Sequence, residues 1–331
     1  MHRHYINKAR LRSFYIERCQ AGGETLGSFL HPVSHAMSES PDTRTLSPWF
    51  RLAPALFVVL WSSGFIFAKL GLPYAEPLTF LFVRFAITTI LFVLIALAFR
   101  ARWPATWREA GHIAVAGAFV QGIYLGGVFW AISRGLGAGV VAMMMGLQPL
   151  LTAAAAGIVL GEKVTLRQWV GLAVGFTGVV LVVADRDTTG SDDWAAIAAN
   201  AVALAGLTVG VLYQKRHATG MDLRSGLAIQ FAVSAALMGA GAILTEDMRI
   251  EWTGTFILAM AWLAVVLSIG AAAIFYSLIR HGAAAKVSSL FYLVPAVTAL
   301  MAFALFDERL GLLALAGMVA VILGVAMATR D

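Results

Sequence analysis

Long apolar stretches alternate with short polar connectors from about residue 52 to the end of the chain. Ten apolar segments follow one another, at roughly 52–72, 78–99, 110–132, 138–160, 168–184, 194–213, 225–245, 254–279, 285–306 and 311–329. A run of about 20 apolar residues is long enough to cross a bilayer as an α-helix. None of the runs shows the alternating strands, about ten residues long, of a membrane barrel. The pattern predicts an all-α integral membrane protein with ten transmembrane helices.

The composition agrees with a chain that is surrounded by a lipid bilayer. Of its 331 residues 60% are hydrophobic and 13% are charged, and the mean hydropathy is +0.82, which is too apolar for a soluble protein of this length. The formal net charge of +6 comes from basic residues scattered between the apolar segments, so nucleic acid is not an expected partner. The single cysteine, Cys19, lies outside these segments and leaves no internal disulfide and no cysteine-based metal site.

The first 48 residues are polar and mixed in charge. Basic residues near the start are not followed by an apolar stretch, so the segment does not have the pattern of a cleavable signal peptide. We expect a disordered cytoplasmic tail. A second hypothesis is that translation begins at Met37, which opens a compact polar lead into the first apolar segment.

The second half of the chain repeats the first at a distance of 146 residues. Shifted by that distance, the stretch from Phe129 to Val183 aligns without a gap on the stretch from Phe275 to Thr329. The residues that interrupt the apolar pattern recur in both copies: Lys69 and Lys215, Arg134 and Arg280, Pro149 and Pro295, Glu162 and Glu308, Gly171 and Gly317, Gly178 and Gly324. The sequence therefore predicts a tail at 1–48 and two five-helix repeats at 49–185 and 186–331.

The two repeats are expected to cross the membrane in opposite directions, because an odd number of helices separates equivalent positions. Lys and Arg are concentrated in the connectors on the side of the N-terminus, which places both termini in the cytoplasm. Glu162 is then cytoplasmic and Glu308 lies outside. Inverted repeats of this kind underlie many secondary transporters, which bind their solute at the repeat interface and work by alternating access.

No Asp or Glu falls in the centre of a predicted span. Proton- and sodium-coupled carriers commonly use a carboxylate there, so its absence weakens carboxylate-based ion coupling. The sequence also lacks metal-ligand spacing and a nucleophile elbow. We therefore expect no catalytic residues, no metal and no cofactor.

Arg84 is the one charge well inside an apolar run, about two turns from its outer end. An arginine at such a depth is costly and is usually paired or lines a cavity. Three interpretations remain open. The side chain extends outward to the interface, pairs with Glu76 and fixes the helix, or binds an anionic group of a solute.

Two prolines lie at matched depths of the fourth and ninth segments. Pro149 and Pro295 are expected to bend their helices and to release backbone carbonyls that a neighbouring helix or a solute must satisfy. The charged hinges that follow, at Glu162 and Glu308, are predicted to act in gating together with these prolines.

Polar and aromatic side chains recur at other depths of the predicted spans. Each buried amide either bridges helices or faces a wet cavity, because an unpartnered one costs free energy. As a set they predict a weakly polar, aromatic-lined cavity suited to zwitterionic or amphipathic solutes. The residues predicted to bind the solute are Trp61, Gln121, Tyr124, Gln148, Asn200, Tyr276 and Tyr292.

These residues resemble the EamA family of the drug/metabolite transporter superfamily. The resemblance covers Arg51 to the C-terminus and is carried by the order and doubling of the following motifs: Trp61-Ser-Ser-Gly-Phe with Lys69, Arg84-Phe85, Gln148-Pro149, Leu160-Gly161-Glu162, Tyr213 with Lys215-Arg216, Gln230, Pro295 and Glu308-Arg309. It implies ten helices in two inverted repeats, a central cavity, and export or exchange of small metabolites across the bacterial inner membrane. Asp307 departs from the family pattern, which has a glycine before the hinge glutamate.

The function predicted from the sequence is alternating-access transport, in the outward direction, of a small amino-acid-like or amphipathic solute. A phosphate-ester or nucleotide-sugar exchanger is the alternative within transport, and it would need more cations in the cavity than Arg84 supplies. A membrane enzyme or a structural scaffold is the alternative of another class. The sequence leaves open whether the protein is a monomer or a homodimer.

Overall fold

The computed structural model describes residues 48–161, 164–185, 193–271, 274, 291 and 293–329. The chain divides into two compact units, Met1–Arg51 and Leu52–Asp331, and the helices described below belong to the second unit except for the first residues of α3. Residues 1–47 of the tail predicted at 1–48, and the predicted site residues Glu162, Tyr276 and Tyr292, lie outside the described residues.

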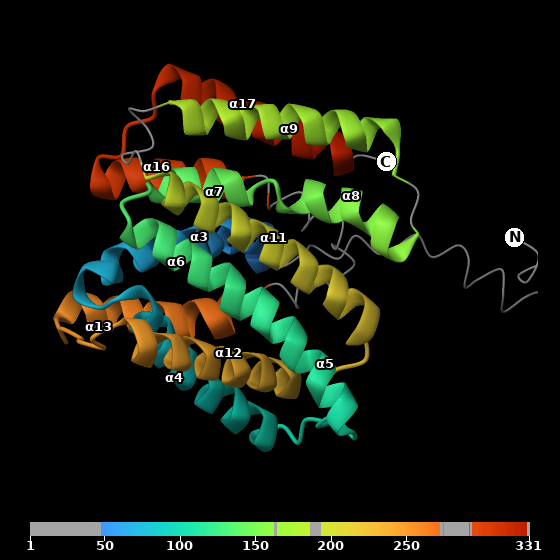
Figure 1. The fold of residues 1–331 in the computed structure, drawn as a ribbon, viewed down its shortest axis with the longest axis vertical. Helices are drawn as coiled ribbons and strands as arrows, with labels where there is room; N and C mark the ends of the chain where they lie inside the picture. Colours follow the sequence, from blue (N-terminus) through green and yellow to red (C-terminus); the bar gives the residue numbers. More distant parts are fainter. Residues whose placement is uncertain are drawn as a thin grey trace, which may run out of the picture. The chain divides into compact units, whose positions relative to one another are not determined.

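The described part of the chain is helical and contains no β-strand. The helices are α3 (Pro48–Gly71), η1 (Leu72–Tyr74), α4 (Pro77–Ala98), α5 (Trp107–Gly117), η2 (Ala118–Ile123), α6 (Tyr124–Ser133), α7 (Ala138–Met145), α8 (Gln148–Leu160), α9 (Leu166–Ala184), α11 (Trp194–His217), α12 (Leu223–Thr245), α13 (Gly254–Ala261), η3 (Trp262–Ala271), α16 (Val294–Phe306) and α17 (Leu312–Thr329) (Figure 1).

Seven stretches of this part are long and apolar enough to cross a membrane, and they coincide with the first seven predicted segments. Within the described residues, the last three predicted segments contain shorter apolar helices, at Gly254–Gly270, Val294–Phe306 and Leu312–Met327. The all-helical membrane class is confirmed. The number of ten helices stays a prediction.

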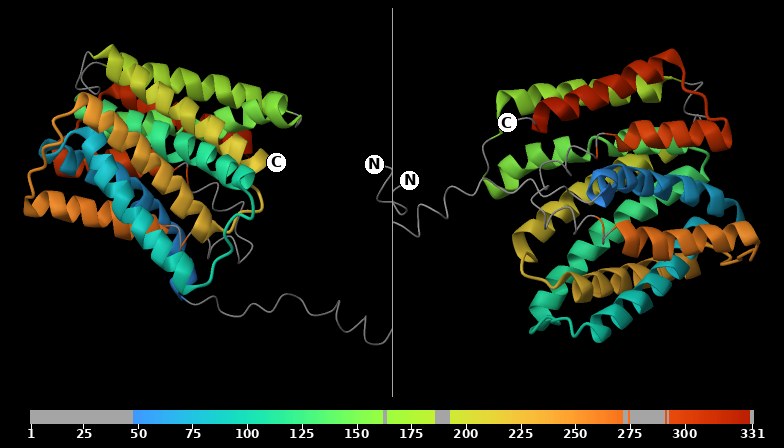
Figure 2. Two further views of the ribbon diagram at one scale, coloured as in Figure 1. Left: turned by 60° about the horizontal axis from the view of Figure 1, so that its bottom comes forward. Right: turned by 180° about the vertical axis from the view of Figure 1, so that it is seen from behind.

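Helices that are equivalent in the two repeats pack on one another. The pairs are α4 with α12 and α9 with α17, and the last pair lies side by side in Figure 1 and in the right-hand view of Figure 2. Glycines bring α9 and α17 into backbone contact, since a Cβ on Gly178 would lie 2.5 Å from the Gly317 carbonyl oxygen. Such small residues let apolar helices approach closely inside a membrane.

Carboxylates and an arginine join α4 and α12 at both of their ends. At one end Glu246 accepts hydrogen bonds from the backbone nitrogens of Leu78 and Thr79 at 2.8 and 2.7 Å, at the start of α4. At the opposite end Asp222 accepts a hydrogen bond from the Arg224 backbone nitrogen at 3.0 Å, and Arg224 donates to the Phe99 carbonyl at 3.3 Å. We call these the Glu246 end and the Asp222 end. The two helices are therefore held as a unit.

The sequence predicts one bent helix for the fourth segment, but the structure divides this segment into two helices. The α7 helix ends at Met145, Gly146 and Leu147 form a turn, and α8 begins at Gln148. Pro149 and Pro295 both lie in the first turn of a helix, α8 and α16. A proline is tolerated there because the backbone N–H that it lacks has no partner within the helix. The prolines start helices where bent helices were expected.

Two stretches of π-helix occupy equivalent positions of the repeats. The η2 stretch, Ala118–Ile123, becomes 264–269 when shifted by 146 residues and falls within η3, Trp262–Ala271. Short π-helical stretches are rare and are frequent at functional sites. Spans three and eight thus share a backbone irregularity that hydrophobic periodicity did not predict.

Candidate functional site

Glu308 joins the end of α3 to the start of α7. Its Oε1 atom accepts hydrogen bonds from Lys69 Nζ and, at 3.0 Å, from the backbone nitrogen of Ala138. Its Oε2 atom accepts from the backbone nitrogen of Gly139 at 3.2 Å. A carboxylate is favoured at this place because the first backbone N–H groups of a helix have no partner within it and carry partial positive charge. We call Lys69, Glu308 and the start of α7 the Glu308 cluster.

The residue before Glu308 has the conformation that its equivalent has in the first repeat. Asp307 ends α16 with a φ of 53°, and Gly161 ends α8 with a φ of 70°. The left-handed conformation suits glycine, and aspartate is one of the few other residues that adopt it routinely. The departure of Asp307 from the glycine pattern therefore preserves the turn.

The α7 and α16 helices are in close contact at the same end. A Cβ on Gly139 would lie 3.5 Å from the Cβ of Ala299. Near the other end of α7, a Cβ on Gly146 would lie 3.0 Å from Cγ of Pro295. The break in the fourth span therefore lies directly against the proline that starts α16.

Trp61 lies where α3 meets the start of α16. Its ring centroid is 5.2 Å from that of Phe291. The neighbouring Ser62 donates a hydrogen bond to the Val294 carbonyl at 3.3 Å, and Ser63 accepts one at 2.8 Å from Nε1 of Trp262 in η3. One face of α3 thus contacts both the π-helix and the broken span of the second repeat.

The amides predicted to bind a solute lie on separate helices. Asn200 is fully buried on α11, and its Nδ2 donates to the Val141 carbonyl of α7 at 3.5 Å. Gln148 donates to Thr152, one turn further along its own helix, at 3.0 Å. Gln121 lies in η2. In the described part of the chain, no hydrogen bond or ring contact joins Trp61, Gln121 and Gln148 to one another.

Arg84 is buried on α4, with a relative exposure of 5%. The guanidinium carbon lies 5.9 Å from the ring centroid of Phe85 and 5.8 Å from that of Phe129. Tyr124, also predicted to bind the solute, is the first residue of α6, the helix that carries Phe129. The structure therefore places Arg84 against α6.

Three buried polar atoms of the described residues have no hydrogen-bond partner: Arg84 Nε, Asn200 Oδ1 and Thr298 Oγ1. Buried polar groups are nearly always paired, so each of these is a candidate for contact with an ordered water or a solute. The sequence analysis missed Thr298. The internal repeat could have pointed to Thr298 in the sequence, since Thr298 is the equivalent of Thr152.

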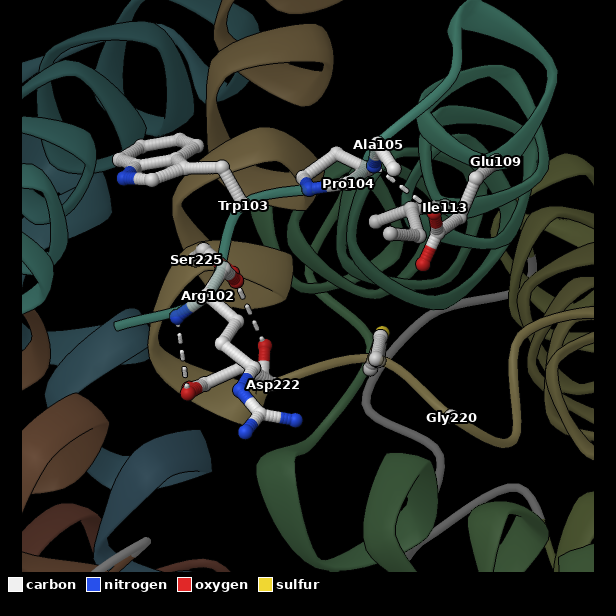
Figure 3. A pocket seen from close by; sticks show the side chains of 10 residues that line it. Arg102, Trp103, Pro104, Ala105, Glu109, Ile113, Gly220, Asp222 and Ser225 are labelled. Atoms are coloured by element: carbon white, nitrogen blue, oxygen red, sulfur yellow. Dashed lines mark hydrogen bonds between the residues drawn. The ribbon is translucent and has the colours of Figure 1, made fainter. Parts of the chain in front are cut away.

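A surface pocket of about 160 Å³ lies at the Asp222 end, between the connectors 99–106 and 218–222 (Figure 3). Its walls include Trp103, Ile113 and Met221. Asp222 accepts a hydrogen bond from the Arg102 backbone nitrogen at 3.3 Å, and Ser225 donates one to the Arg102 carbonyl at 2.5 Å. No residue predicted to bind a solute lines this pocket, which is a junction between two connectors.

Among the described residues, no group of three or more His, Cys, Asp and Glu side chains could hold a metal ion. The buried polar groups of the helices are amides, hydroxyls and one guanidinium, apart from Asp185 at the end of α9. Groups of this kind can bind and orient an organic solute.

Comparison with known proteins gives relatives along most of the chain. An "Uncharacterized transporter YvbV" of Bacillus subtilis (strain 168) is 25% identical over 88% of this chain and 93% of its own length. An "Uncharacterized inner membrane transporter YedA" of Escherichia coli (strain K12) is 27% identical over 81% and 86%. A "Probable amino-acid metabolite efflux pump" of the same strain is 25% identical over 81% and 91%.

A solved crystal structure has the same fold. It superposes with a TM-score of 0.60 at 18% sequence identity and covers 84% of this chain and 95% of its own. The sequence model of the EamA-like transporter family matches the chain twice, at residues 51–184 and 194–330. The two matches, together with the packed pairs of equivalent helices, lead to one conclusion: the chain belongs to the EamA-like transporter family.

Proposed function

We propose that the protein exports a small organic solute across the bacterial inner membrane by alternating access, with its two repeats inverted and both termini in the cytoplasm. The observation that carries the proposal is the Glu308 cluster, in which one carboxylate holds α3 and α7 together. Its equivalents in the other repeat are Lys215 and Glu162. In an inverted pair these fall at opposite membrane faces, as two alternating gates require.

The packing of the helices supports a division into stable and moving parts. The pairs α4 with α12 and α9 with α17 are joined by helix-end hydrogen bonds and by glycine contacts. The backbone irregularities lie elsewhere, in η2, η3 and the break before α8. We propose that spans three, four, eight and nine move against the paired helices, and that α7 and α16 separate from each other when the gate at the Glu308 cluster opens.

The solute is proposed to be amino-acid-like or amphipathic. The named substrate of one relative, an amino-acid metabolite, supports this class and the outward direction. The name of another relative supports the inner membrane. A phosphate-ester exchanger would need several buried cations around the phosphate, and among residues whose burial is described Arg84 is the only buried Lys or Arg.

A reversible cross-link tests alternating access directly. The Cβ separation of 3.5 Å between a substituted Gly139 and Ala299 suits a disulfide, and Cys19 is the only native cysteine to remove. The full chain with Cys19→Ser, Gly139→Cys and Ala299→Cys is reconstituted in liposomes loaded with a panel of amino acids, and efflux is measured. We expect efflux to stop on oxidation and to return on reduction.

The single variants Gly139→Cys and Ala299→Cys, oxidised in parallel, serve as controls. Efflux that continues through the cross-linked protein would contradict separation of α7 from α16. Absence of efflux of every solute from the unmodified protein would contradict the transport proposal itself.

A further inference from the structure

Arg84 is a buried cation that pairs with no carboxylate in the described part of the chain. Its exposure is 5% and its Nε atom has no hydrogen-bond partner. Other basic residues of the described chain do pair with carboxylates, as Lys69 does with Glu308 and Arg224 with Asp222. Because a buried charge is costly unless it is paired, the position demands an explanation.

The two structural explanations offered by the sequence do not hold. An arginine that extends to the interface would expose much of its side chain, and Arg84 is only 5% exposed. Glu76 does not pair with Arg84, because the Oε2 atom of this exposed carboxylate accepts a hydrogen bond from the Asp247 backbone nitrogen at 2.8 Å. Arg84 therefore does not fix α4 to its connector through a pair with Glu76.

The second repeat shows that the fold does not need a cation at this position. The equivalent of Arg84 is Gln230, a buried amide whose Nε2 donates to Gln214 at 3.1 Å. The next residues in each copy, Phe85 and Phe231, are both buried and contact each other, with ring centroids 5.7 Å apart. Both copies thus bury the same aromatic residue, and only the first adds a positive charge.

The surroundings of Arg84 are aromatic. The ring centroids of Phe85 and Phe129 lie 5.9 and 5.8 Å from its guanidinium carbon, and Phe129 belongs to α6, which follows directly on the η2 π-helix. A guanidinium presents N–H donors in a fork that matches the two oxygens of a carboxylate. The adjacent rings suit an apolar group next to that carboxylate.

We infer that Arg84 forms the subsite that binds the carboxylate of the transported solute. The guanidinium holds the two carboxylate oxygens, and Phe85 and Phe129 contact the apolar part. The solute class is then a small carboxylate with an apolar side group. This inference rests on the proposed transport function, which it narrows from amphipathic solutes to carboxylates.

The test compares solutes that differ only in the carboxylate. The full chain is purified and assayed with amino acids and with their carboxamides, as wild type, Arg84→Gln and Arg84→Lys. The exposed arginine of the Glu246 end is changed in Arg249→Gln as a matched control. Efflux from liposomes gives transport, and the shift in Tm caused by each solute in detergent gives binding without transport.

We expect wild type to favour carboxylates over carboxamides by roughly 10- to 100-fold, since hydrogen bonds to charged groups carry that much discrimination. Arg84→Gln should lose this preference while moving or binding the carboxamides as before, and Arg84→Lys should keep part of it. Arg249→Gln should behave as wild type. The Tm of Arg84→Gln without solute should equal or exceed that of wild type, because an unpaired buried cation is removed.

Other outcomes overturn the inference. If Arg84→Gln loses transport and binding of carboxylates and carboxamides equally, and its Tm is lowered, Arg84 supports the fold. Unchanged carboxylate preference would place the subsite elsewhere. If wild type moves carboxamides but not carboxylates, transport stands and the subsite falls. If carboxylates stabilise wild type but not Arg84→Gln and no solute is moved, the subsite stands and transport falls.

Discussion

The Nζ atom of Lys69 donates a hydrogen bond to the Oε1 atom of Glu308, 239 residues further along the chain. The same carboxylate accepts the backbone hydrogen bonds of Ala138 and Gly139. Glu308 thus has two partners of different kinds, a cation at the end of α3 and the positive end of α7. A change at either partner should reveal which of them the carboxylate serves.

Exchanging the charges of Lys69 and Glu308 should not restore the stability that the Glu308 cluster provides. We expect Glu308→Gln to lower the free energy of unfolding by about 1–2 kcal/mol, because the side chain is largely buried and loses a charge-assisted pair. In Lys69→Glu/Glu308→Lys the ion pair can form again, but a lysine at the start of α7 opposes the helix dipole. The measurement is a double-mutant cycle of unfolding in detergent.

A full rescue by the charge exchange would contradict the role of Glu308 at the start of α7. Arg309→Gln is the control, because it breaks an ion pair whose two side chains are more than 70% exposed and leaves Asp307 in its left-handed turn. Exposed pairs contribute little, so we expect this change to have almost no effect on unfolding.

The glycine contact between α9 and α17 should not tolerate a methyl group. A Cβ on Gly178 would lie 2.5 Å from the Gly317 carbonyl oxygen, so Gly178→Ala must push two backbones apart, at a cost of about 1–3 kcal/mol of unfolding free energy. Gly111 in α5 has no atom within 4 Å of an added Cβ. Gly111→Ala should therefore be neutral or stabilise the helix slightly. Equal effects of the two changes in an unfolding titration would contradict the close packing.

Periodicity predicted much of the fold because a membrane helix needs one continuous apolar run. The first seven segments were predicted in the places where the structure has long apolar helices. The break at Gly146 and Leu147 was missed, since both residues fit an apolar run and the signal for the break is the proline that follows. The π-helices at η2 and η3 were missed because composition does not distinguish them from α-helix.

The site was predictable in its residue types but not in its contacts. Arg84 and Asn200 stood out as polar groups in apolar runs, and both have a buried atom without a partner. Sequence alone could not place Phe129 beside Arg84, because that depends on how α6 packs against α4. It also could not show that Glu308 reaches the start of α7. Contacts between distant segments are set by tertiary packing.

Asp222 should make the stability of the Asp222 end depend on pH. The hydrogen bond from the Arg224 guanidinium, assisted by backbone hydrogen bonds, lowers the pKa of Asp222 from 3.8 to about 2. A carboxyl whose pKa is lower in the folded state contributes stability that is present above pH 3.8 and is lost as the pH falls toward 2. We expect about 1 kcal/mol, reduced by solvent screening.

The comparison is Asp222→Asn against wild type in unfolding titrations from pH 6 downward. The difference between the two proteins should be constant above about pH 4 and should close near pH 2. A difference that persists unchanged to the lowest pH would mean that the charge of Asp222 is not the stabilising feature.

Asn200 provides a test of whether an unsatisfied buried amide serves the solute or the fold. Its Oδ1 atom has no partner and its side chain is fully buried between α11 and α7. Replacing it by the similar-sized leucine removes a polar atom that the fold leaves unpaired, so Asn200→Leu should unfold with the same or a slightly higher free energy, by up to about 1 kcal/mol. Efflux should nevertheless fall.

Thr208→Val on the same helix is the control. Thr208 already donates a hydrogen bond to the Leu204 carbonyl at 2.8 Å, so its replacement should leave efflux unchanged. A loss of stability in Asn200→Leu without a loss of efflux would assign Asn200 to helix packing alone.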